Sequence, residues 1–222
     1  MNLERNEIWD EFQWEEYMRR EERMLDRYLE LYYRYSGDPE HGKKIAEALG
    51  WSEFLDFGRT NEEGVEPYSS EADEELEGES WKRVTGYEGF DDQGAALQRL
   101  GAFVLAQEFE LSAGGFVDSL PGEMKEHSSV VEFLSQALIV PSTVAKGFGM
   151  GTEMDAVGGN IALCKRALAV SNQVFESLRQ LRRSGILQLH HYRAFVREAA
   201  EVRNAIALHV VDLRDHSRSG LR

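Results

Sequence analysis

Of the chain's 222 residues, 42% are hydrophobic and 29% are charged, as in a typical soluble globular protein. The formal net charge is −15, and residues 1–89 alone hold 25 acidic and 11 basic residues. So acidic a chain argues against nonspecific nucleic-acid binding, which needs many Lys and Arg contacts to phosphate. A chain of this length can bury one sizeable core, and we expect a single domain over residues 1–222.

The sequence gives little indication of a membrane segment or of disulfide bonds. Residues 1–12 lack the basic and then apolar pattern of a secretory signal. We find no apolar run that approaches the roughly 20 residues of a membrane span. The single cysteine, Cys164, excludes an intrachain disulfide and fits a small core residue. We therefore expect a cytoplasmic protein that does not bind a membrane.

The first predicted helix covers residues 6–35. Ser36-Gly37-Asp38-Pro39 is expected to end it. Its apolar side chains follow a near-heptad spacing, at Trp14, Met18, Leu25, Tyr28, Tyr32 and Tyr35. An aromatic stripe at this spacing usually belongs to a core. Because tyrosine and tryptophan also suit interfaces, the stripe fits a dimer seam as well.

Shorter helices are expected in the middle of the chain. Residues 39–57 contain one short helix and a further helical turn, and residues 90–111 form a longer helix. Between them, residues 58–89 are crowded with acidic side chains, and we expect a mobile acidic loop there. Residues 121–127 and 129–140 are predicted as two more short helices.

Glycine and proline residues are expected to end or interrupt several of the predicted helices. Ala113-Gly114-Gly115 is expected to stop the helix that begins at residue 90, and Pro141 to break the helix before it. The run Gly147–Gly151 indicates a flexible linker. The pair Gly158-Gly159 is small enough for another helix to approach closely.

The last third of the chain is predicted to form a helical hairpin. Residues 152–183 and 187–214 both repeat apolar side chains three or four positions apart, the spacing of one buried helix face. Ser184-Gly185 separates them, and glycine is the usual residue just past a helix end. We therefore expect two long antiparallel neighbours.

Together these elements predict an all-α fold, an antiparallel bundle of about four main helices with short accessory helices and an acidic loop. The main helices are expected near residues 6–35, 90–111, 152–183 and 187–214. The short helices within 39–57 and 116–147 are expected to cover the ends or sides of the bundle.

Two carboxylates fall on otherwise apolar stripes. Glu21 shares the helix face of Trp14 and Leu25, and Glu108 shares that of Leu97 and Val104. A buried carboxylate is costly unless it is paired, protonated or bound to a metal. Inward carboxylates in a helical bundle resemble the ferritin-like di-iron proteins, which implies a divalent metal held by Glu21 and Glu108. The Glu-x-x-His pairs of that family are absent from the sequence.

A second resemblance lies in the last predicted helix. Arg203-Asn204-Ala205-Ile206-Ala207-Leu208-His209 resembles the Arg-polar-x-His signature of HEPN-type nucleases, which are also helical bundles. The resemblance implies RNA cleavage by Arg203 and His209, across a dimer. The two side chains are 120° apart on a helix, so they converge only through a bend or a second subunit.

No cofactor motif is found, so no cofactor is predicted, and a divalent metal is the alternative. We expect a non-enzymatic helical protein that binds another protein or itself, with a dimer through the first helix as the specific form. A metal-binding bundle at Glu21 and Glu108 and an RNA-cleaving bundle at Arg203 and His209 are the two alternatives.

Overall fold

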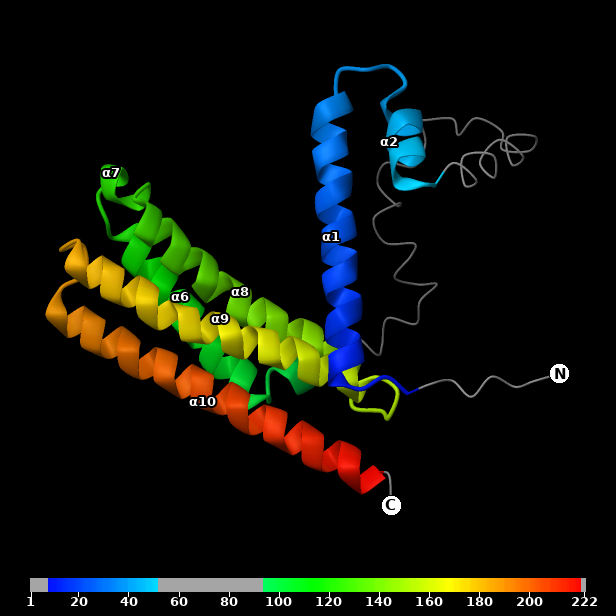
Figure 1. Ribbon diagram of the computed structural model, residues 1–222. Helices are drawn as coiled ribbons and strands as arrows, with labels where there is room; N and C mark the ends of the chain where they lie inside the picture. The colour runs from blue at the N-terminus through cyan, green and yellow to red at the C-terminus, as the bar shows by residue number, and fades with distance from the viewer. Residues whose placement is uncertain (1–7, 52–93, 221–222) are drawn as a thin grey trace, which may run out of the picture. The chain divides into compact units, whose positions relative to one another are not determined.

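The computed structural model describes residues 8–51 and 94–220 (Figure 1). The expected acidic loop at residues 58–89 lies outside these ranges. Every regular element within them is an α-helix, which confirms the all-α prediction. By internal contacts the chain divides into two compact units, residues 1–15 with 88–222 and residues 16–87. Each unit is described by itself, and the single domain stays a prediction.

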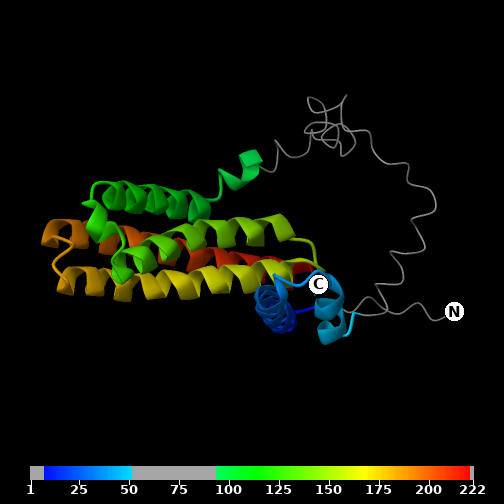
Figure 2. The same cartoon turned by 90° about the horizontal axis from the view of Figure 1, so that it is seen from above.

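Four long helices of the larger unit pack against one another. They are α6 (Gly101–Asp118), α8 (Ser128–Met150), α9 (Val157–Arg183) and α10 (Leu189–Gly220). Helix α9 contacts α8 and α10, and α6 contacts the same two helices from the other side. Contacting helices run antiparallel in both views (Figures 1 and 2). The short α7 (Gly122–Lys125) precedes α8 and contacts it.

Helix α8 takes the place in this set that we expected for the first helix, residues 6–35. It is also longer than predicted, because neither Pro141 nor the glycine run ends it. Val140 and Val144, on either side of the proline, are buried, so core packing carries the helix through the missing amide hydrogen bond. Gly147 is buried in α8 against α9, where an added Cβ would lie 3.0 Å from Asn160 Oδ1, closer than an ordinary van der Waals contact.

Helix α6 also departs from its predicted bounds. It begins at Gly101 rather than residue 90, since Leu100 is extended, and it continues through Gly114 and Gly115 to Asp118. Ala113 and Val117 are buried on either side of the glycines, so tertiary packing outweighs their low helix propensity. The predicted stop at this glycine pair is therefore wrong.

The C-terminal hairpin agrees with its prediction. Residues 184–188 separate helices α9 and α10, and Gly185 among them has the positive φ of +77° that favours glycine. Helix α9 begins at Val157, five residues after the predicted start. The predicted faces are buried, as Leu178 and Ile206 illustrate, and Cys164 is a buried core residue as expected.

An aromatic cluster joins three of the packed helices. Phe109 of α6 and Phe133 of α8 meet edge to face, with ring centroids 6.0 Å apart. Phe195 of α10 contacts both, at 6.1 Å and 5.5 Å. Edge-to-face pairs add to the burial energy of the rings, so this cluster fixes how the helices pack at that level.

Within the described residues, α8 is long and apolar enough to cross a membrane by length and composition alone. The expectation that no run reaches that length is therefore wrong. Helix α8 contacts α6, α7 and α9, and 44% of its most apolar window is buried. A core helix meets the same test, so membrane binding and localisation stay predictions.

The smaller unit contains most of α1 (Glu11–Tyr35) and all of α2 (His41–Leu49). Both helices were predicted, and Gly50 ends α2 with a φ of +74°. Leu31, Ile45 and Ala46 are buried, while the rest of α1 beyond residue 15 is largely exposed. The ring of Tyr28 stacks on Trp51, which lies just past α2. Little of α1's aromatic stripe is therefore core.

Candidate functional site

Glu21 and Glu108 are both exposed, so the premise of two buried carboxylates is wrong. Glu21 is 47% exposed and lies 4.0 Å from Arg20. In α6 the buried face is not the predicted one: Ala106 and Phe109 face the core, whereas Leu111 is 71% exposed. The packed face combines Ala106 with the large rings of Phe103 and Phe109, so the contacts with the neighbouring helices, and not the leucine spacing, mark the buried side.

A metal centre gains no support from the geometry. Among the described residues, no group of three or more His, Cys, Asp or Glu side chains is arranged to hold a metal ion. Glu108 lines a pocket of about 220 Å³ with Glu198 and Glu201, but these three do not form such a group. The metal-binding alternative stays a prediction.

The second pair, Arg203 and His209, is not brought together by one chain. The Arg203 guanidinium lies over the ring of Phe175 on α9, 5.6 Å from its centroid, and donates to Asn204 Oδ1 at 3.0 Å. His209 Nε2 is buried with no hydrogen-bond partner among the described groups. Burial lowers the pKa of His209, although Asp212 opposes the shift. The RNA-cleaving alternative stays a prediction.

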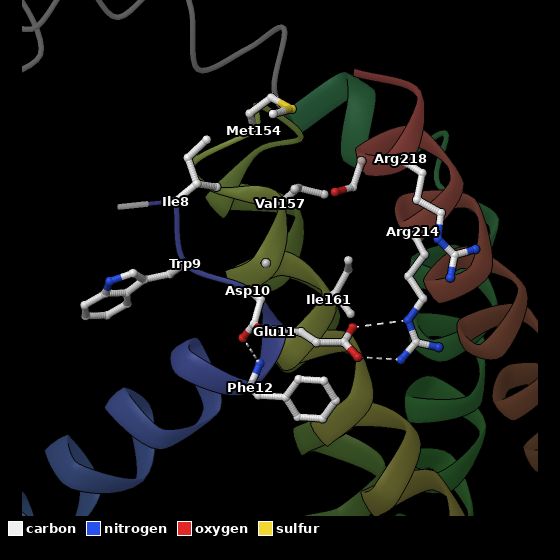
Figure 3. A pocket seen from close by; sticks show the side chains of 12 residues that line it. Ile8, Trp9, Asp10, Glu11, Phe12, Met154, Val157, Ile161, Arg214 and Arg218 are labelled. Carbon is white, nitrogen blue, oxygen red and sulfur yellow. Dashed lines mark hydrogen bonds and ion pairs between the residues drawn. The ribbon is translucent and has the colours of Figure 1, made fainter. Parts of the chain in front are cut away.

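A recess in the larger unit lies where residues 8–12 meet the start of α9 and the end of α10 (Figure 3). This pocket, of about 430 Å³, was not predicted. Its apolar lining comes from the segment before and into α1 and from the α9 end. The lining side chains are Ile8, Trp9, Phe12, Met154, Val157 and Ile161. The α10 wall contributes Arg214, Ser217 and Arg218.

Asp10 positions the chain at the pocket by starting α1. Its Oδ1 accepts hydrogen bonds from the amides of Phe12 and Gln13, each 2.9 Å long, and Gln13 Oε1 accepts from the Asp10 amide at 2.9 Å. This reciprocal cap satisfies amides that a helix start otherwise leaves unpaired. The spacing Asp-x-x-Gln was a sequence signal for this start that the periodicity argument missed.

Glu11 clamps this first turn to α9 and α10. Its carboxylate oxygens accept from Arg214 Nη2 at 2.7 Å and from Arg214 Nε at 3.1 Å, a two-bond pairing drawn in Figure 3. Lys165 Nζ on α9 lies 3.5 Å from Oε1. Burial alone would raise the pKa of Glu11, but the bond from Arg214 and the charge of Lys165 outweigh it, so the pKa is lowered.

A second clamp lies one helical turn further along α1. Glu15 pairs with Arg166 of α9, with Nε 2.8 Å and Nη2 3.4 Å from its oxygens. Both side chains are partly buried, at 27% and 23% exposure. Two forked ion pairs therefore fix residues 11–15 on the same surface of the bundle.

The glycine pair of α9 provides the room for this contact. A Cβ on Gly158 would lie 2.5 Å from the Trp9 carbonyl oxygen, and one on Gly159 would lie 2.6 Å from Met150 Cε and 3.2 Å from Trp14 Cδ2. The predicted close approach at these glycines is therefore confirmed, and its partners are the chain entering α1 and its first turn.

Comparison with protein-family models, curated proteins and solved structures finds no match for this chain. Any function must therefore be inferred from the chain's own surfaces and pockets.

Proposed function

We propose that the chain is a helical binding protein that associates with a second copy of itself through α1. The supporting observation is the exposure of large apolar side chains on this helix. Leu25 is 57% exposed, Leu29 39%, Tyr32 43% and Tyr33 74%. They follow the spacing i, i+4, i+7 and i+8 and therefore share one face of the helix. Contiguous exposed apolar surface is typical of an interaction site.

The spacing favours a second copy as the occupant. Met18, Leu25 and Tyr32 are separated by seven residues each, so they repeat one heptad position with Leu25 at the centre. A two-fold axis at Leu25 would pair Leu25 with Leu25 and Met18 with Tyr32 of an antiparallel copy. A surface that complements itself in this way is what a two-fold interface requires.

The charges favour the antiparallel arrangement. Residues 11–22 of α1 hold five acidic and two basic side chains, whereas residues 23–35 hold two acidic and three basic ones. With the axis at Leu25, residues 15–22 of one copy, with four acidic and two basic side chains, lie opposite residues 28–35 of the other, with one of each. A parallel copy places the two acidic halves together, which costs free energy through like-charge repulsion.

The mass of the particle in solution tests the proposal. Light scattering should give twice the chain mass of 25.3 kDa, and Leu25→Asp should give a monomer, because two carboxylates would meet at the axis. Leu111→Asp is the matched control: Leu111 is an exposed leucine on α6, at 71% exposure, and its variant should stay a dimer. A parent chain that stays monomeric at high concentration would remove the proposal.

Cross-linking tests the orientation. Cys164 is buried, so an introduced cysteine is the reactive thiol. Leu25→Cys should form a disulfide-linked dimer under mild oxidation, whereas Tyr32→Cys should not, since an antiparallel copy separates the two positions. Efficient cross-linking of both variants would indicate a parallel pair.

A further inference from the structure

The pocket between the start of α1, the start of α9 and the end of α10 has the size and lining of a small-ligand site. Its volume of about 430 Å³ falls within the range of about 300–1,000 Å³ that such sites occupy. Aliphatic and aromatic side chains form one side and arginines the other (Figure 3). A ligand with an apolar body and one polar end matches this division of the pocket lining.

Three of the four charged side chains that line the pocket are held by short bonds within the chain. Asp10 is committed to the cap of α1, and Glu11 to Arg214 and Lys165. Arg214 in turn donates hydrogen bonds from Nε and Nη2 to the two carboxylate oxygens of Glu11.

Arg218, one turn further along α10, differs from these neighbours. Its ion pair with Asp215 is 3.5 Å long, and the two side chains are 76% and 67% exposed. So exposed a pair contributes little free energy, and an incoming anion can replace Asp215. The Arg218 guanidinium presents a fork of donors that suits a carboxylate.

We propose that this pocket binds an amphipathic monocarboxylate, with its apolar body against Val157 and Ile161 and its carboxylate on Arg218. The walls are held in place without a ligand, because the Glu11–Arg214 and Glu15–Arg166 ion pairs fix residues 11–15 on the bundle. Gly158 keeps the chain at Trp9 close to α9, since a Cβ there would lie 2.5 Å from the Trp9 carbonyl oxygen. Binding therefore needs little reorganisation.

Titration calorimetry with decanoate, decanol and decylamine tests the proposal. Decanoate, kept below its self-association concentration, should bind saturably, and the tryptophan fluorescence should change because Trp9 lines the pocket. Decanol should bind at least about tenfold more weakly than decanoate, since it lacks the charge that Arg218 recognises. Decylamine should not bind detectably. Equal binding of decanol and decanoate, or no saturable binding of decanoate, would overturn the proposal.

Arg218→Gln should weaken decanoate about fivefold and leave decanol unchanged, because one charge-assisted contact is lost at an exposed position. Arg183→Gln is the matched control. Arg183 is 75% exposed and lies 3.8 Å from Glu176, in the last turn of α9 and away from the pocket. Its variant should bind decanoate like the parent. Equal effects of the two substitutions would show that the carboxylate does not sit on Arg218.

Discussion

Glu11 and Arg214 are 203 positions apart in sequence and share two hydrogen bonds, of 2.7 Å and 3.1 Å. The pair joins the first turn of α1 to the last turns of α10. Since Lys165 of α9 lies 3.5 Å from the same carboxylate, one acidic side chain ties together three helices. The wall of the candidate pocket depends on this contact.

A double-mutant cycle with Glu11→Gln and Arg214→Gln should give a coupling free energy of about 1 kcal/mol in unfolding by urea. The Glu11 side chain is only 11% exposed, so its bonds are better protected from water than those of a surface pair. The control cycle is Arg27→Gln with Glu30→Gln in α1, whose side chains are about half exposed; it should give about 0.3–0.5 kcal/mol. Equal couplings would contradict the argument.

The coupling free energy between Glu11 and Arg214 should also become smaller as the pH is lowered. Its pKa in the folded chain is lowered from the ordinary value of 4.5, so the folded state favours the ionised carboxylate. The contribution of this ion pair to the free energy of unfolding is fully present above pH 4.5 and is lost as the pH falls through the lowered pKa. The cycle measured at neutral pH should therefore shrink when it is repeated in acid.

Gly158→Ala should destabilise the chain by about 1–3 kcal/mol, because its Cβ would meet the Trp9 carbonyl oxygen at 2.5 Å. The loss should be accompanied by a change in tryptophan fluorescence as Trp9 and Trp14 move. Gly114→Ala is the control, since an added Cβ there meets nothing within 4 Å. As a glycine inside α6, its replacement should stabilise the chain by about 0.5–1 kcal/mol. Thermal unfolding measures both effects.

Periodicity predicted the C-terminal hairpin well, because both helices carry a continuous apolar stripe that the core buries. Leu178 and Ile206 illustrate the two faces, and both are fully buried. In α6 the same reasoning selected the wrong face. Leu111 is exposed, while Phe103, Ala106 and Phe109 are buried against the neighbouring helices.

Residues that usually end a helix are outweighed in α8 by packing against residues that are distant in the sequence. Pro141 and Gly147 both lie inside α8, and Gly147 packs closely against Asn160 and Cys164 of α9. The pocket escaped prediction for the same reason. Its clamp joins Glu11 to Arg214, and neither residue has a local pattern that indicates the other.

Cys164 should be inert in the folded chain. It is fully buried, and burial raises the pKa of its thiol to about 12, so almost no thiolate is present near neutral pH. A thiol reagent such as Ellman's reagent at pH 8 should react slowly with the native chain and at once after unfolding in guanidinium. Rapid reaction of one thiol in the native chain would show that α8 and α9 open readily at Gly147.

His209 should make stability fall as the pH drops below neutral. Burial lowers its pKa from 6.5, so the unfolded chain binds a proton more readily, and stability rises with pH between the lowered pKa and 6.5. His209→Leu removes this proton and also the buried Nε2 that has no partner among the described residues. The variant should therefore be more stable than the parent by about 1 kcal/mol at neutral pH, and by more at pH 5. A His209→Leu variant that keeps the parent's slope would show that another group causes the acid sensitivity.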